Sequence, residues 1–395
     1  MLRTVIFSLF LSTSALVTAC QGDQFTVEPA ADPEFSEEPF EVILPSVSSE
    51  EHEFRVVRIL RDLNHPWSVS WLPDGRMLVT ERSGRLLLAE GDQAVPVGGL
   101  PEIQSQGQGG LLDVVVHPDY ETSGWIYFTY TAAEGTQTAV VVARAKLSGT
   151  TLTDTEELFR ESPAKNPGRH YGSRIAFPGD GTLFFTIGDR GQRTPSQDLG
   201  DPAGSTLRLN EDGTIPAGNP FVGDPAVRPE IYSYGHRNAQ GMAIHPETAA
   251  VWQHEHGPRG GDALNVIRAG NNYGWPVATY GRNYGTMTRI GIEPHEDPEI
   301  TNPITWWGPS SIAPSGMAFY TDGPFTGWNG DLFIGALGQR HLLRLVLEGE
   351  EVIHQEKLLE GDLGRIRDVR TGPDGFIYLL TDQSNGALYR VEAVF

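Results

Sequence analysis

The chain has 395 residues, of which 29 are lysine or arginine and 51 are aspartate or glutamate, giving a formal net charge of −22. Non-specific binding of DNA or RNA depends on lysine and arginine displacing counterions from phosphates, so this charge and the lack of a concentrated basic patch exclude a nucleic-acid partner. Glycine (46) and proline (28) are well above average usage, which indicates many tight turns.

The N-terminus has the features of an export signal. Residues 1–19 carry one positive charge, Arg3, followed by an apolar stretch that is short for a bilayer span and ends in small residues. Cys20 is the only cysteine, and the run Val17-Thr18-Ala19-Cys20 resembles a bacterial lipobox, in which the thiol receives a diacylglyceryl group before cleavage. Ordinary secretion with a free thiol is the alternative. We expect an exported protein on the periplasmic side of a bacterial membrane, touching that membrane only through its lipid anchor.

The next segment is strongly acidic. From residue 21 to residue 54 there are ten acidic residues and no lysine or arginine. This composition is typical of a solvated, disordered segment, although an acidic substrate-binding tail is an alternative. We predict a lipidated, flexible tether over residues 20–53, followed by one folded domain over residues 54–395.

Beyond residue 54, one short pattern recurs six times. Each copy has an apolar or alternating strand, a turn, and a second apolar strand, with turns at Asp74, Asp119, Asp180, Glu247, Asp322 and Asp374. The roughly 57 residues available per copy fit a four-stranded blade with its loops. We therefore predict an all-β, six-bladed β-propeller with four-stranded antiparallel blades, and keep a two-sheet sandwich array as the alternative.

The two ends of the domain are predicted to meet. Residues 54–60 (FRVVRIL) precede the first copy, and residues 387–395 (ALYRVEAVF) follow the sixth. Pairing of these N- and C-terminal strands would complete one blade and close the ring, which removes open sheet edges.

Polar side chains are concentrated just before the inner strands, where propeller loops converge on the central channel. The runs GQGG, GRHYGSR, SYGHRNAQ and GRIRD each place an amide, imidazole or guanidinium there. Several such groups in equivalent positions predict one shared, anion-accepting site.

These runs, together with TIGDRG, EHGPRGGD, NYGWP and PSSIAPSGM, resemble the glucose/sorbosone dehydrogenase family. This is the family of soluble quinoprotein aldose sugar dehydrogenases, six-bladed propellers that use pyrroloquinoline quinone (PQQ) and calcium. The resemblance covers roughly residues 63–391, with the motifs in the family's order. It implies an enzyme that oxidises the C1 hydroxyl of aldoses to lactones, passes hydride to PQQ, and then reduces a quinone or a redox protein.

The resemblance also implies roles for individual residues. His170 matches the general base that takes the proton from the C1 hydroxyl, with a channel histidine bonded to a carbonyl as the alternative. Arg237 matches the arginine that stabilises negative charge on the reduced quinone. The residues expected to hold the cofactor are Gln108, Arg237, Asn238, His256, Arg365 and Arg367. For Arg365 and Arg367, a surface ion-pair strand is the alternative.

Gly257 and Pro258 match the backbone carbonyls that bind the calcium shared with the quinone, where calcium acts as a Lewis acid. His254 and His256 suggest zinc as an alternative, but two histidines without a third ligand are weak evidence.

Two positions depart from the family pattern. Gly338 stands where a lysine near the quinone is usual, so one positive contact is missing unless Arg340 reaches in. Ala263 stands where a glutamate usually joins a tyrosine carbonyl, here that of Tyr273, in a second calcium site, which is therefore doubtful. A propeller that lost tight PQQ binding and recognises sugars or partners is the alternative function. A metal-dependent lactonase would need a channel cluster of Glu, Asn and Asp, whereas these loops carry Arg, Gln and His.

Overall fold

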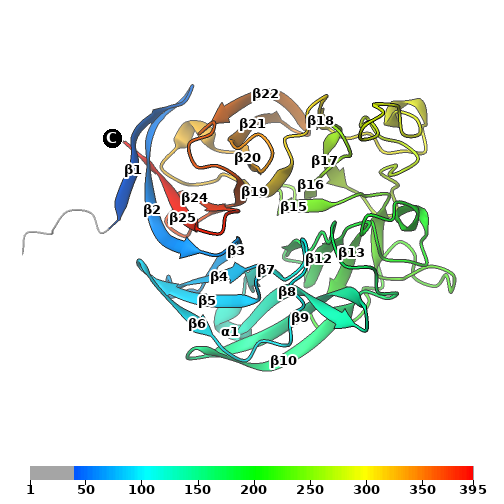
Figure 1. Ribbon diagram of the computed structural model, residues 1–395, viewed down its shortest axis with the longest axis horizontal. Coiled ribbons are helices and arrows are strands. Elements are labelled where there is room, and N and C mark those ends of the chain that lie inside the picture. The colour runs from blue at the N-terminus through cyan, green and yellow to red at the C-terminus, as the bar shows by residue number, and fades with distance from the viewer. Residues whose placement is uncertain (1–39, 395) are drawn as a thin grey trace, which may run out of the picture. The chain divides into compact units, whose positions relative to one another are not determined.

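The computed structural model describes residues 40–394, which form six antiparallel sheets arranged around a central axis as the blades of a β-propeller (Figure 1). This confirms the predicted fold, and each of the six predicted hairpins is the inner strand pair of one blade. The first blade contains β3 (Pro66–Trp71), β4 (Met77–Glu81), β5 (Arg85–Glu90) and β6 (Gln93–Val97). The second contains β7 (Leu111–Val116), β8 (Trp125–Glu134), β9 (Gln137–Ser148) and β10 (Thr151–Arg160). The third contains β11 (Ile175–Ala176), β12 (Thr182–Ile187), β13 (Ser205–Asn210) and β14 (Ile231–Tyr234).

The last three blades complete the ring. The fourth blade contains β15 (Ala239–Ile244), β16 (Val251–Glu255), β17 (Asp262–Ile267) and β18 (Thr305–Trp307). The fifth contains β19 (Pro314–Phe319), β20 (Leu332–Ala336), β21 (Leu342–Glu348) and β22 (Glu351–Leu358). The sixth contains β23 (Ile366–Thr371), β24 (Ile377–Thr381), β25 (Gly386–Ala393), β2 (Glu53–Leu63) and β1 (Glu41–Ser48). In the part of the chain that the structure describes, helical structure is limited to α1 (Tyr120–Ser123) and short 3₁₀ turns at Thr194–Gln197, Pro294–Glu296 and Thr326–Trp328. Within residues 40–394, no helix has the length and apolarity needed to span a membrane.

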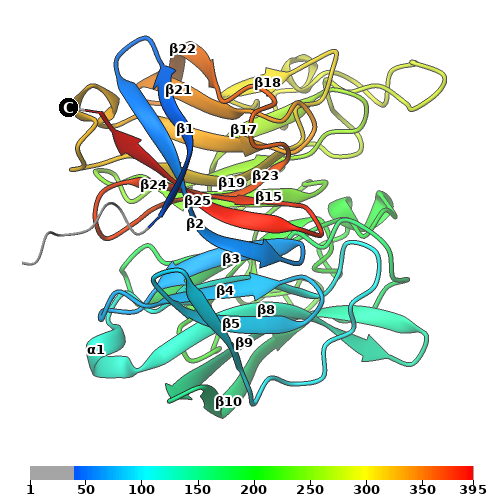
Figure 2. The same ribbon diagram turned by 60° about the vertical axis from the view of Figure 1, so that its left-hand side comes forward.

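The ring is closed by the two ends of the chain. Strand β2 lies beside β25 in the sixth blade, with Phe54 opposite Ala393 and Leu63 opposite Gly386 (Figure 2). The predicted pairing of N- and C-terminal strands is therefore confirmed.

The expectation of a flexible tether up to residue 53 is wrong for its last part. Strand β1 pairs with β2, with Glu41 opposite Arg58 and Val47 opposite Phe54, so residues 41–48 belong to the sixth blade. The backbone ladder holds this segment in place, and Leu44 and Val47 pack against the apolar core of the sixth blade. The predicted signal peptide, Cys20 and tether residues 20–39 lie outside the described residues.

The apolar core is divided among the interfaces between blades. One buried cluster joins Leu78 and Leu88 of the first blade to Leu111 and Phe128 of the second. Equivalent clusters join the other neighbouring blades, because each sheet is apolar on both faces and packs against the next.

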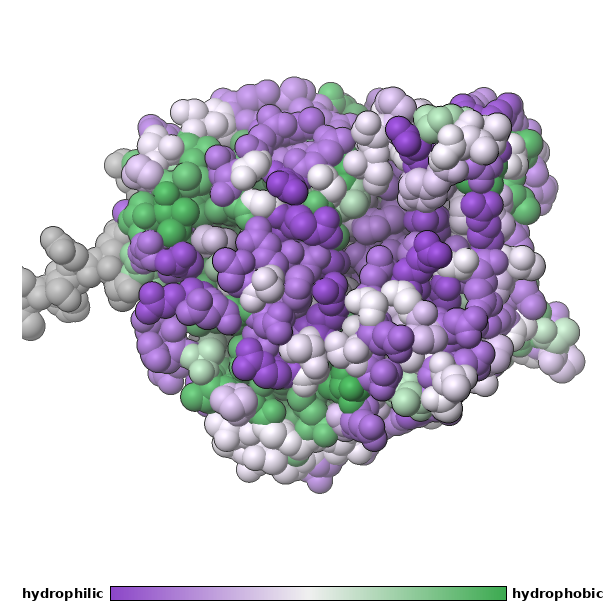
Figure 3. Space-filling view, viewed as in Figure 1, coloured by the Kyte–Doolittle hydropathy of each residue, from purple (hydrophilic) through white to green (hydrophobic). Residues whose placement is uncertain are grey.

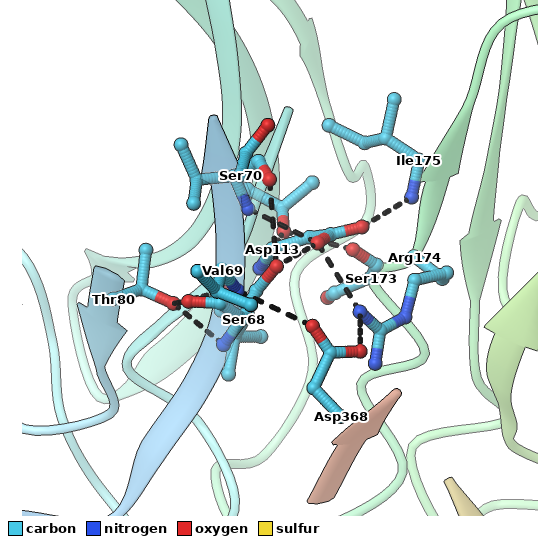
Figure 4. A network of polar contacts seen from close by, with 12 residues as sticks. Ser68, Val69, Ser70, Thr80, Asp113, Ser173, Arg174, Ile175 and Asp368 are labelled. Carbon is cyan, nitrogen blue, oxygen red and sulfur yellow. Dashed lines mark hydrogen bonds and ion pairs between the residues drawn. The ribbon is translucent and has the colours of Figure 1, made fainter. Parts of the chain in front are cut away.

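A buried polar network crosses the axis of the ring (Figure 4). The Arg174 guanidinium, 1% exposed, lies 3.2 Å from Asp113 and 2.9 Å from Asp368, and it stacks 4.2 Å above the Trp67 ring. Asp113 also accepts hydrogen bonds from Ser68 Oγ at 2.6 Å and the Ile175 amide at 2.8 Å. These residues come from the first, second, third and sixth blades, so charge pairing ties together blades that do not adjoin.

Candidate active site

The predicted site residues lie in loops that enter or leave the inner strands at one end of the channel. On the face shown in Figure 3, hydrophilic residues surround the middle of the ring. His170 precedes β11, Arg237 and Asn238 precede β15, and Arg365 precedes β23. A further residue, Asp189, follows β12 in the run TIGDRG.

His170 is held by a buried carboxylate. Its Nδ1 lies 2.6 Å from Oδ1 of Asp189, a residue that is 1% exposed. Asp189 also accepts hydrogen bonds from the Gly191 amide at 2.6 Å and from Nε1 of Trp275 at 2.8 Å. These donors fix the carboxylate, which in turn fixes the proton of His170 on Nδ1. No described residue bonds to Nε2, so this nitrogen can accept a proton from a ligand.

The electrostatics of the pair favour a neutral imidazole. Burial lowers the pKa of His170 below its usual 6.5, the positive charge of Arg237 lowers it further, and the hydrogen bond to Asp189 opposes both. Burial alone would raise the pKa of Asp189, but the hydrogen bond from His170 and the charge of Arg237 hold it below its usual value. At neutral pH the site therefore holds an unprotonated histidine next to an ionised aspartate.

Gln108 and Asn238 lie on either side of the His170 loop. Gln108 Oε1 accepts a hydrogen bond from the His170 amide at 2.8 Å, and Asn238 Oδ1 accepts one from the Gly172 amide at 3.2 Å. The Nδ2 of Asn238 is buried without a hydrogen-bond partner among the described residues. Both amides can thus offer an NH₂ group to a bound carbonyl.

Arg237 is a buried cation, 8% exposed. Its Nη1 donates to the His256 carbonyl at 2.9 Å, and its guanidinium lies 5.5 Å from the Trp275 ring centroid. No carboxylate of residues 40–394 forms an ion pair with it, and burial lowers its pKa. A buried arginine without a counter-ion is well suited to stabilise negative charge on a ligand.

Arg365 and Arg367 share one carboxylate. Their Nη2 atoms lie 3.1 and 2.8 Å from Oδ2 of Asp382. Arg367 is 5% exposed and its Nε is buried without a partner among the described residues, so Arg367 is not part of an ordinary surface ion pair, whereas the side chain of Arg365 is 43% exposed.

The EHGPRGGD loop presents backbone oxygens. No hydrogen-bond donor in residues 40–394 reaches the carbonyls of Gly257 or Pro258, whereas the Gly257 amide donates to Asp262 Oδ1 at 2.9 Å. A Cβ at Gly257 would lie 2.3 Å from the Gly261 carbonyl, so the tight loop requires glycine. Free carbonyl oxygens of this kind are the ligands that calcium prefers, and the loop fits the predicted ion.

The two histidines of this segment are neutral donors. His254 is fully buried, its Nε2 bonds the Ser315 carbonyl, and burial lowers its pKa to about 3. The Nε2 of His256 donates to the Pro314 carbonyl at 2.6 Å. Within residues 40–394, no group of three His, Cys, Asp or Glu side chains is placed to hold a metal, so zinc finds no support.

The departures from the family pattern have local consequences. A Cβ at Gly338 would lie 2.9 Å from the Ile312 carbonyl, so a longer side chain would require a shift. Ala263 and Tyr273 line a cavity of about 30 Å³ together with Glu255. Both oxygens of Glu255 already accept hydrogen bonds, from His236 and the Arg237 amide, so these residues do not favour a second calcium ion.

Sequence reasoning missed three residues that organise the site: Asp189, Trp275 and Asp382. Asp189 lies in TIGDRG, directly after a predicted strand, which was the available signal. Trp275 lies in NYGWP, another of the family runs, which was its signal. Asp382 gave no such signal, because folding brings it to the site from the end of β24.

The chain matches the family model described as glucose/sorbosone dehydrogenase over residues 63–390, and it belongs to that family. This is a family of sugar dehydrogenases with quinoprotein members. The chain is 41% identical to the aldose sugar dehydrogenase YliI of Escherichia coli over 342 residues, covering 85% of this chain and 92% of that protein.

Solved structures agree with this assignment. The apo-form of the soluble aldose sugar dehydrogenase from Escherichia coli has a TM-score of 0.83 and 40% identity, over 86% of this chain and all of that one. The PQQ-bound aldose sugar dehydrogenase from Streptomyces coelicolor has a TM-score of 0.69 and 28% identity, over 85% and 96% of the two chains.

Proposed function

We propose that the protein oxidises the C1 hydroxyl of an aldose to the lactone, with PQQ and calcium as cofactors. When bound, PQQ supplies the electrophile that accepts the hydride from C1, and calcium polarises it. The observation that carries the proposal is the His170–Asp189 pair: Nε2 of His170 has no partner among the described residues, and the charge of Arg237 acts on the imidazole.

The chain's own residues account for the movement of the proton. His170 Nε2 takes the proton of the C1 hydroxyl while the C1–H bond is broken and the C1–O double bond forms. The imidazole becomes positively charged, and Asp189, 2.6 Å away, stabilises that charge without itself being protonated. His170 later releases the proton to solvent. An external acceptor would then remove from the cofactor the two electrons that came with the hydride.

The cationic and amide groups would bind and orient the cofactor. Arg237 offers a positive charge where negative charge develops, and Arg365 and Arg367 offer guanidiniums suited to carboxylates. The carbonyls of Gly257 and Pro258 would bind calcium. Asn238 and Gln108 would donate to cofactor carbonyls.

The test uses the full chain prepared without cofactor. PQQ and calcium are added, and glucose-dependent reduction of an artificial electron acceptor is followed, with His170→Ala alongside. We expect reduction by the wild type and a loss of several orders of magnitude in the variant. No reduction at saturating cofactor would overturn the enzymatic function and favour a binding propeller. An active His170→Ala variant would overturn the role of His170.

We also propose that the protein is exported and acylated on Cys20, on the strength of the lipobox-like run that ends at this residue. The expected result is incorporation of labelled palmitate by the wild type and none by Cys20→Ser. Equal labelling, or none in either, would contradict the proposal.

A further inference from the structure

Asp382 is the centre of a cluster of cationic side chains drawn from two blades. Besides Arg365 and Arg367 of the sixth blade, its Oδ1 lies 3.1 Å from His65 Nδ1 and 3.9 Å from Arg82 Nη1, both from the first blade. The Asp382 side chain is only 7% exposed, so this carboxylate sits inside the cluster.

The positive charge of this cluster is not balanced. Three guanidiniums share one carboxylate, and Asp382 is the only ion-pair partner of Arg82, Arg365 or Arg367 within residues 40–394. By contrast, the buried Arg344 lies 2.6 Å from Asp331 and 2.7 Å from Glu356. An uncompensated, partly buried positive charge is unfavourable unless an anion binds to it.

Arg82 is fixed at this position by its backbone. Its amide donates to the His65 carbonyl at 3.1 Å, and its carbonyl accepts from Ser105 Oγ at 3.0 Å. Gly110 packs so closely that a Cβ there would lie 1.8 Å from the Arg82 carbonyl oxygen. The side chain remains 22% exposed, which leaves the guanidinium accessible to a ligand.

Arg340 does not supply the positive charge that is missing at Gly338. Its side chain is exposed and makes no hydrogen bond or ion pair with described residues. Gly338 itself has no side chain to offer, and the Ile312 carbonyl limits the space beside it. The cation that joins Arg365 and Arg367 therefore comes from the first blade.

We infer that Arg82 is a third anion-binding arginine of the cofactor site, which supplies the positive contact missing at Gly338 and is positioned with Arg365 and Arg367 by Asp382. The inference rests on the proposed function, because it assigns the anion to the carboxylates of PQQ. Its chemistry requires no covalent step, only charge-assisted hydrogen bonding to a carboxylate.

The experiment measures binding rather than turnover. PQQ is titrated into the full apo chain in the presence of calcium, and quenching of tryptophan fluorescence gives Kd for the wild type, Arg82→Gln, Arg82→Lys and Arg340→Gln. Arg76→Gln is the matched control, since Arg76 pairs with Asp74 in an exposed turn of the same blade. The trimethyl ester of PQQ, which lacks the carboxylates, is the matched probe.

We expect Arg82→Gln to weaken PQQ binding about ten- to hundredfold, as for loss of a charge-assisted hydrogen bond. Arg82→Lys should fall between this variant and the wild type, which also shows that the loss is not one of folding. Arg76→Gln and Arg340→Gln should match the wild type, and the ester should bind the wild type and Arg82→Gln equally.

Two failures are distinguishable. If the wild type does not bind PQQ, the proposed function falls and this inference falls with it. If the wild type binds PQQ and Arg82→Gln binds it equally well, or if Arg340→Gln is the variant that weakens binding, the inference is wrong while the proposed function stands.

Discussion

Nδ1 of His170 lies 2.6 Å from Oδ1 of Asp189, and the peptide groups of the two residues are also linked, since the amide of Arg190, next to Asp189, donates to the His170 carbonyl at 3.3 Å. The strands on either side of these loops are paired with each other, Ile175 opposite Phe185. One short hairpin thus holds both members of the pair in register.

Asp189→Asn tests whether the reaction depends on the His170–Asp189 pair. The amide keeps the shape of the side chain, but it can turn its NH₂ toward Nδ1, which then moves the proton of His170 to Nε2. We expect kcat to fall about 10²- to 10⁴-fold with little change in KM for the sugar or in Kd for PQQ. Asp92→Asn, on an exposed turn, is the control. A variant with wild-type kcat would show that the carboxylate has no part in the reaction.

The pH dependence of the rate follows from the environment of His170. The base must be unprotonated, so kcat/KM should rise with pH through the pKa of His170 and stay level above it. Because burial and the charge of Arg237 lower this pKa, the midpoint should lie below 6.5. Arg237→Gln removes the positive charge and should move the midpoint upward, whatever its effect on the maximal rate. A midpoint that does not move, or that moves downward, contradicts this account.

Calcium should act together with PQQ. The EHGPRGGD loop offers free carbonyls but no cluster of three His, Cys, Asp or Glu side chains exists within residues 40–394 to hold the ion alone. We expect calcium to raise the melting temperature of the PQQ-loaded protein and to leave that of the apo protein nearly unchanged, as measured by calorimetry. Magnesium is the control ion. An equal rise without PQQ would instead indicate a separate calcium site.

The polar network on the axis should matter for stability. Arg174→Gln removes one of the two arginines that pair with the buried Asp113 and Asp368, while Arg370 remains, and we expect the free energy of unfolding in urea to fall by about 2–4 kcal/mol. Arg160, whose ion pairs with Glu134 and Glu157 are exposed, is the matched control, and Arg160→Gln should cost less than about 1 kcal/mol. Equal effects of the two variants would mean that the network adds no stability.

The sequence was enough to predict the six blades, because each inner hairpin carries its own strand pattern and turn. It was misleading for β1, because this strand lies within residues 21–54, a segment whose ten acidic residues and lack of lysine and arginine resemble a tether. Only the backbone ladder with β2 makes it a strand, and that depends on a partner elsewhere in the chain.

For the site, the residues whose roles the family resemblance implies were predicted, and the residues that support them, such as Asp189 and Asp382, were not. His170 and Arg237 stand in family motifs, and the structure places them together with Gln108 and Asn238 around one channel end. Arg82 and Asp382 come together only because the first and sixth blades are neighbours, so no local sequence pattern predicts their contact.

The pairing of β2 with β25 has a consequence for how the chain reaches its native state. Arg55 Nε donates to Glu392 across 337 positions in the sequence. During translation, β2 is made long before β25, so one edge of β2 stays unpaired until β25 is made, and such an edge is prone to wrong pairing. Contacts of such long range also slow folding. A chain that stops before β25 cannot join β2 to β24 in the sixth blade, so its ring stays open.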